Sequence, residues 1–69
     1  MLNNNKVKSF ATRLRAVSLA EYLLTNGIPC SVSQAKWTNK RLPPPRVEVF
    51  VSDDNLTRAI QLAEETDTW

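Results

Sequence analysis

The 69-residue sequence contains no histidine and a single cysteine, Cys30. One cysteine cannot form an internal disulfide, and small secreted domains normally need several. A zinc site of ordinary ligand type is excluded, because the chain offers one thiol and no imidazole. Strand alternation around Cys30 points its side chain inward, so we expect a small buried hydrophobe rather than a reactive thiol. The sequence therefore predicts a cytoplasmic protein with no metal and no other cofactor.

The sequence also lacks the residue sets that carry catalysis. The one glycine, Gly27, cannot form a glycine-rich phosphate loop. Without histidine there is no familiar pair of nucleophile and general base. The adjacent carboxylates Asp53-Asp54 and Glu64-Glu65 point to divergent faces and suit helix caps and surface better than acid–base chemistry. We therefore predict that the chain is not an enzyme.

Long apolar stretches are missing as well. The uninterrupted apolar runs are two or three residues, whereas a membrane span needs roughly 20. The N-terminal ten residues have no apolar segment of the kind found in secretory signals. The 42% hydrophobic content is ordinary for a globular chain. We predict one small domain, residues 1–69, with a flexible leader at 1–5 and no membrane partner.

Charge is divided unevenly along the chain, although the net charge is only +2. Residues 1–52 carry eight basic and two acidic side chains, a net +6. Residues 53–69 carry one basic and five acidic side chains, a net −4. Such a division can steer a charged partner to one side of the molecule. It can equally be a solvated surface that keeps a small domain soluble.

A helix that leads directly into a strand is the clearest joint in the sequence. Ser18 and Glu21 have the spacing of a capping box, although the helix could instead start at Thr12 or Arg13. Asn26-Gly27 suits the helix C-terminus, where a residue with positive φ is needed. An early start predicts a buried stripe of Val17, Ala20, Leu23 and Leu24, with Ala16 beside it and Tyr22 at its margin.

Two segments alternate apolar and polar residues with the period of a strand, 28–33 and 46–51. We expect them to pair antiparallel around the loop that joins them. A first strand over Lys6–Thr12 has an ambiguous face, because Val7 and Phe10 lie on opposite sides of it. The side chains predicted to face the core are Ile28, Cys30, Val32, Val47, Val49 and Val51, whereas Arg46, Glu48 and Phe50 face away.

A second helix should follow the possible caps of Ser52–Asn55 and run to about Thr66, before a short tail that ends in Trp69. Its predicted stripe is Leu56, Ala59, Ile60 and Ala63. The order is therefore β-α-β-β-α, of the α+β fold class. A three-stranded sheet with two helices packed on one face buries both stripes against the valines. The first strand should lie beside the third or the second.

The segments LAEYLLTNGIPCSV (19–32) and PRVEVFVSDDNLTRAIQLAEE (45–65) resemble a family of small, uncharacterised prokaryotic signal-transducing domains. The resemblance spans roughly residues 6–65 and is specific at 26–28 and 46–54. It implies a ferredoxin-like half-fold, related in outline to nitrogen-regulatory PII-type proteins. It implies no catalytic residues, and the loop of this chain departs from the family pattern.

That loop, residues 34–45, is basic and proline-rich, and three consecutive prolines exclude a regular helix there. A tryptophan in a long basic loop is a natural contact residue. The alternative is that Trp37 folds back over the small core as a lid. The candidate partner-binding residues are Lys36, Trp37, Lys40 and Arg41 in the loop, together with Arg46 and Phe50 on the uncovered sheet face.

Two functions compete for these residues. The favoured one is a protein-binding regulatory module that docks an acidic partner, or a second copy of the chain as a homodimer, through the loop and the uncovered sheet face. Phage-encoded inhibitors of host proteins have this size and lack catalytic groups. The alternative is a single-stranded nucleic-acid-binding module, in which Trp37 and Phe50 stack on bases while the loop lysines and Arg41 follow phosphates. It is less favoured, because the net charge is small and the sheet lacks an aromatic-rich strand.

Overall fold

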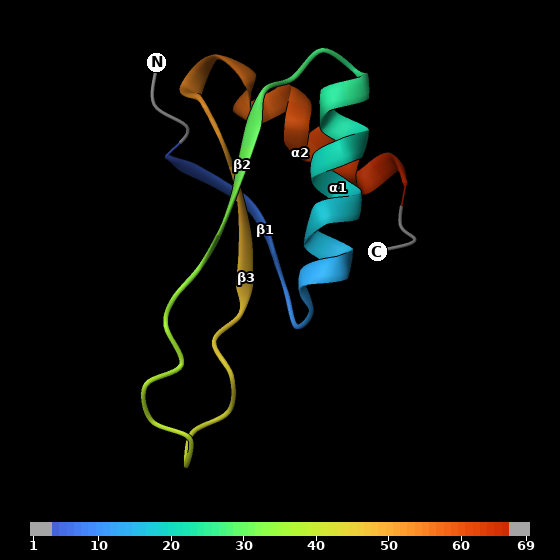
Figure 1. The fold of residues 1–69 in the computed structure, drawn as a ribbon. Coiled ribbons are helices and arrows are strands. Elements are labelled where there is room, and N and C mark those ends of the chain that lie inside the picture. The colour runs from blue at the N-terminus through green and yellow to red at the C-terminus, as the bar shows by residue number, and fades with distance from the viewer. Residues whose placement is uncertain (1–3, 67–69) are drawn as a thin grey trace.

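The computed structural model describes residues 4–66 and has the predicted order β-α-β-β-α, an α+β fold (Figure 1). Residues 1–3 of the predicted leader and the tail at Trp69 lie outside the described residues, whereas Asn5 already belongs to the first strand. The elements are β1 (Asn5–Phe10), α1 (Arg13–Thr25), β2 (Cys30–Gln34), β3 (Val47–Val51), the short 3-10 turn η1 (Asp53–Asn55) and α2 (Leu56–Glu65).

The sheet has the order β1-β3-β2, so the last strand in the chain is the central one. β3 pairs antiparallel with both neighbours, which confirms the predicted pairing of the second and third strands. The first strand lies beside the third. β1 and β2 therefore run parallel to each other with β3 between them, which is the split β-α-β arrangement.

Both helices cover one face of this sheet, as predicted (Figure 1). Val47, Val49 and Val51 are fully buried on that face. The same cluster takes Ala16, Leu19 and Leu23 from α1, Ala59 and Ala63 from α2, and Phe10 and Ile28 from the flanking segments. On the opposite, open face Glu48 and Phe50 are only half-buried.

α1 begins at Arg13, which is one of the two early starts considered above. Ser18 therefore lies inside the helix, where its hydroxyl donates a 2.9 Å hydrogen bond to the carbonyl of Leu14. The capping box predicted at Ser18 and Glu21 is wrong, because Ser18 lies within the helix and its hydroxyl bonds to a carbonyl of the preceding turn instead of capping a helix N-terminus. Leu24 is 56% exposed and does not belong to the buried stripe. The buried side chains are Ala16, Leu19, Ala20 and Leu23.

The predicted end of α1 is confirmed. Gly27 has φ +80°, the only positive φ among the described residues. Its N–H donates to the carbonyl of Leu24 and the N–H of Ile28 donates to the carbonyl of Leu23, both at 2.9 Å. These two bonds form a Schellman motif. Ile28, 2% exposed, then packs in the same cluster as Leu23 and carries the chain into β2.

The ambiguous face of β1 is explained by a bulge. Lys6 lies opposite Phe50 and Lys8 lies opposite Val49, so Val7 is an extra residue on β1. The shift lets both Val7 and Phe10 contact the core. In α2 the prediction for Ile60 is wrong, since it is 37% exposed. The helix is rolled so that Leu62, rather than Ile60, packs beside the two buried alanines.

Candidate functional site

Residues 35–46 connect β2 to β3 and form an extended segment, here called the arm. Figure 1 shows the arm running out beyond the end of the sheet, away from both helices. None of its residues belongs to the hydrophobic core. Connections of this length without secondary structure are uncommon in compact domains and are often functional. The predicted loop at 34–45 corresponds to the arm, except that Gln34 is the last residue of β2 and pairs with Val47 of β3.

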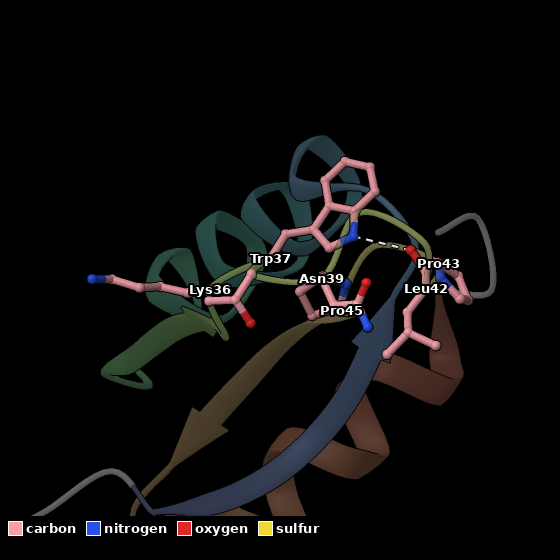
Figure 2. A pocket seen from close by; sticks show the side chains of 7 residues that line it. Lys36, Trp37, Asn39, Leu42, Pro43 and Pro45 are labelled. Atoms are coloured by element: carbon pink, nitrogen blue, oxygen red, sulfur yellow. Dashed lines mark hydrogen bonds between the residues drawn. The ribbon is translucent and has the colours of Figure 1, made fainter.

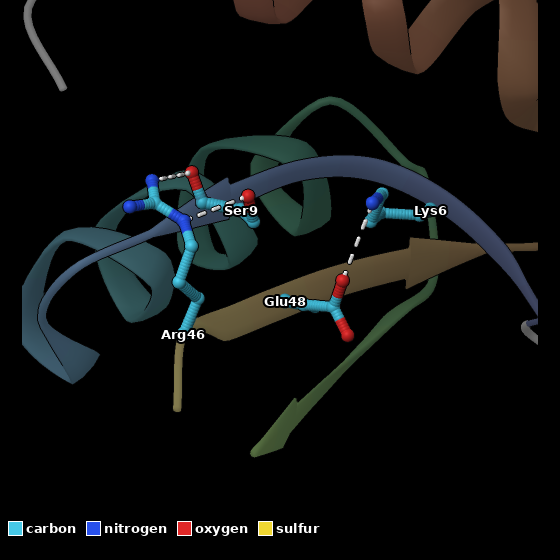
Figure 3. A network of polar contacts seen from close by, with 4 residues as sticks. All are labelled: Lys6, Ser9, Arg46 and Glu48. Carbon is cyan, nitrogen blue, oxygen red and sulfur yellow. Dashed lines mark hydrogen bonds and ion pairs between the residues drawn. The ribbon is translucent and has the colours of Figure 1, made fainter. Parts of the chain in front are cut away.

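The root of the arm is tied to the sheet on both sides. Arg46 donates from Nε to the hydroxyl of Ser9 and from Nη2 to the carbonyl of Ser9, each at 3.1 Å (Figure 3). The side-chain amide of Gln34 donates to the carbonyl of Pro45 at 3.0 Å. Arg46, a predicted partner-binding residue, therefore orients the arm against β1 through its guanidinium. Sequence reasoning missed Ser9, because its partner lies 37 positions away.

The outer part of the arm is a folded turn built around Trp37. The indole N–H donates a 3.0 Å hydrogen bond to the carbonyl of Leu42 (Figure 2). The ammonium of Lys40 lies 4.0 Å from the centroid of the indole ring. Asn39 closes the turn, since its carbonyl accepts from the N–H of Leu42 and its side-chain oxygen accepts from the N–H of Arg41, each at 3.1 Å.

Trp37 is 40% exposed and lies outside the core cluster. The alternative in which it closes over the core as a lid is therefore wrong. The physical reason is the length and direction of the arm, which runs out beyond the end of the sheet (Figure 1).

A shallow hollow of about 170 Å³ opens beside Trp37 (Figure 2). Pockets that enclose a whole small-molecule ligand are typically about 300–1,000 Å³. This hollow is therefore suited to a single apolar side chain of a larger partner. Lys36 and Trp37 are its only lining residues among the predicted partner-binding residues, because consecutive prolines indicate a loop but not how that loop packs on itself. The lining consists of Lys36, Trp37, Thr38, Asn39, Leu42, Pro43 and Pro45.

The arm is positively charged. It contains four basic residues and no acidic one. Lys36, Lys40 and Arg41 are exposed, and within residues 4–66 no acidic side chain forms an ion pair with any of them. The ion pair that the described residues do form, Lys6–Glu48 at 3.4 Å, lies on the open sheet face (Figure 3). No ion pair within the described residues therefore neutralises the charge of the arm.

Phe50 stands apart from the other candidate residues. It lies on the open face opposite Lys6 and Ser31. Phe50 is four residues along the chain from Arg46 at the root of the arm, a separation of about 13 Å at 3.3 Å per residue. The structure thus brings Lys36, Trp37, Lys40 and Arg41 together and leaves Phe50 on a separate surface.

Cys30 contributes to packing. It is half-buried against the core, and its thiol donates to the carbonyl of Ala20 at 3.3 Å. Burial raises the pKa of the Cys30 thiol above its ordinary value. Within residues 4–66, no three side chains of the metal-binding types are grouped so that they could hold an ion. Over the same range, no helix has the length and apolar character to cross a bilayer.

Comparisons of the chain with protein-family models, with curated proteins and with solved structures found no match. The resemblance to prokaryotic signal-transducing domains therefore stays a prediction.

Proposed function

We propose that this protein is a non-enzymatic regulatory module of the cytoplasm that docks a partner protein through the arm. The observation that carries the proposal is the setting of Trp37. The ring is exposed, yet it is fixed by the carbonyl of Leu42 and the ammonium of Lys40. Large aromatic side chains dominate the energetics of protein interfaces. A ring that is already ordered loses less entropy on binding.

The charge of the arm indicates the kind of surface it fits. Lys36 lines the hollow together with Leu42 and Pro43. Lys40 lies over the neighbouring ring of Trp37, and Arg41 is exposed next to it in the chain. A partner that offers one apolar side chain within an acidic surface would fill the hollow and meet the positive rim. Complementary charge of this kind raises the association rate and the specificity. A regulator of a signalling protein and a phage-type inhibitor of a host protein would both use such a surface.

Single-stranded nucleic acid is the competing ligand, since Trp37 and the basic side chains could stack on a base and follow phosphates. Two features favour protein. Lys40 already lies over the indole ring, so a base would have to displace it. Phe50 is on another surface, so the two aromatic side chains form no common stacking platform.

The test is affinity capture from the native host with three immobilised proteins: the wild type, Trp37→Ala and Leu24→Ala. Leu24 is the matched control, because it is a large exposed apolar side chain on α1, and the arm runs away from that helix (Figure 1). We expect one protein to be retained by the wild type and by Leu24→Ala. Trp37→Ala should bind it at least about 30-fold more weakly, the effect of losing a hot-spot contact of ~2 kcal/mol. All three proteins should melt at the same temperature.

Retention of the same protein by Trp37→Ala would contradict the proposal. Nuclease treatment separates the competing ligand, because loss of the retained material after nuclease would show that nucleic acid is the partner. Nucleic-acid binding should also fall steeply with salt as counterions are released. A melting temperature several degrees lower for Trp37→Ala would show that the ring supports the fold.

A further inference from the structure

The two edges of the sheet are protected very differently. β1 and β2 are the edge strands, because β3 lies between them. β1 carries a bulge and two lysines, Lys6 opposite Phe50 on the open face and Lys8 opposite Val49 on the core face. Lysines and bulges are the devices by which natural sheets prevent pairing between edges. β2, with the sequence CSVSQ, has no charge, no proline and an unbroken register with β3.

The side chains of β2 also leave the core incomplete at this edge. Cys30 and Val32 face the core, but both are only half-buried. On the open face Ser31 and Ser33 are exposed. A strand added beside β2 would take up the unused backbone groups of this edge and cover the remaining exposed surface of Val32.

We infer that the strand added there is β2 of a second copy, paired antiparallel about a two-fold axis at Val32. CSVSQ is self-complementary in that register, because Ser31 faces Ser33 of the second copy and Val32 faces Val32. An uncharged strand does not repel its own copy, whereas the lysines of β1 would. Pairing ends at Pro29, which has no N–H to donate. The result is a six-stranded sheet whose two arms leave at opposite ends.

The expected association is weak and depends on concentration. Five paired residues on each side bury less surface than the roughly 1,200–2,000 Å² of a stable specific interface. This interaction surface is separate from the arm and does not depend on the proposed function. A dimer with two arms would nevertheless bind a multivalent partner more tightly than one arm does, through effective concentration.

The experiment is sedimentation velocity at rising concentration, with paired substitutions on β2. In the proposed register S31K/S33K sets lysine against lysine across the axis, whereas S31K/S33E sets lysine against glutamate. T57K/Q61K is the matched control, because both positions are exposed on α2 and it also adds two charges. We expect the wild type, S31K/S33E and T57K/Q61K to rise from 7.8 kDa toward twice that mass. S31K/S33K should stay at 7.8 kDa with an unchanged circular dichroism spectrum.

A wild-type chain that stays monomeric at concentrations up to about 1 mM would overturn the inference. So would an S31K/S33K variant that associates like the wild type, or an S31K/S33E variant that does not. If S31K/S33K melts at a lower temperature than the wild type, the test is instead amide hydrogen exchange of the wild type. Protection of β2 amides that increases with protein concentration supports the pairing, and unchanged protection overturns it.

Discussion

Trp37 illustrates how an exposed side chain can be ordered without joining a core. Its contact with the ammonium of Lys40, 4.0 Å from the ring centroid, is of a kind worth about 0.5–1 kcal/mol at exposed sites. Its hydrogen bond to Leu42 satisfies the indole N–H, which is the one polar group of the ring. Immobilising a side chain on binding costs roughly 0.5–1.5 kcal/mol. The arm meets part of that cost before any partner arrives.

Cys30 predicts a pH dependence. Burial raises the pKa of its thiol, so the folded state favours the neutral form. The stability that the neutral thiol allows is fully present below the pKa of the thiol in the unfolded chain, and it is lost as the pH rises through the higher folded pKa. We expect the thiolate absorbance of the native protein to titrate at higher pH than that of the urea-unfolded protein. Equal titration midpoints, or a lower midpoint for the native protein, would contradict the raised pKa of the Cys30 thiol.

At the scale of elements, adjacent residues of α1 give a sharp contrast. Leu23 is fully buried, whereas Leu24 is 56% exposed. Leu23→Ala should cost about 2–5 kcal/mol, because it leaves a cavity under the sheet. That is a large share of the stability of so small a domain. Leu24→Ala should change the free energy of unfolding by less than about 0.5 kcal/mol. Urea unfolding of the two variants measures both values. A loss of stability for Leu24→Ala that exceeds the loss for Leu23→Ala would show that Leu24, and not Leu23, faces the core.

The elements could be predicted where the signal is local. The valines of β3 alternate within five residues, and Gly27 marks the end of α1 through its own backbone requirement. The rotation of each helix about its axis could not be predicted, as Leu24 and Ile60 show. Each lies next to a buried residue in the helical stripe, and only packing against the sheet decides which flank is covered.

The candidate site was predictable to the same degree. Its composition identified Trp37 and the basic side chains of the arm. The bond from the indole to Leu42 depends on how the arm folds back on itself, and the clamp from Arg46 to Ser9 joins residues 37 positions apart. No local pattern carries such information, so the hollow and the root of the arm could be found only in the folded chain.

At the scale of the whole molecule, the arm should be removable. Gln34 and Val47 are paired, Ala35 follows Gln34 and Arg46 precedes Val47. An Asn-Gly turn in place of residues 36–45 would therefore close a two-residue hairpin in the existing register. We expect an unchanged fold and a free energy of unfolding that is equal or about 1 kcal/mol higher, because a shorter loop costs less entropy to close. Partner binding should be lost. Circular dichroism and thermal melting test the fold, and loss of cooperative unfolding would show that the arm supports the core.

The central position of β3 has a consequence for the order of folding. β1 and β2 have no strand to pair with until residues 47–51 have been made. Domains generally fold as units while the ribosome delivers about 5–20 residues per second. Among the elements described within residues 4–46, α1 alone can form its backbone hydrogen bonds locally. The sheet should therefore form from both sides at once when the valines emerge. A nascent chain arrested before Val47 should be open to proteases and chaperones, whereas one arrested after α2 has emerged should not.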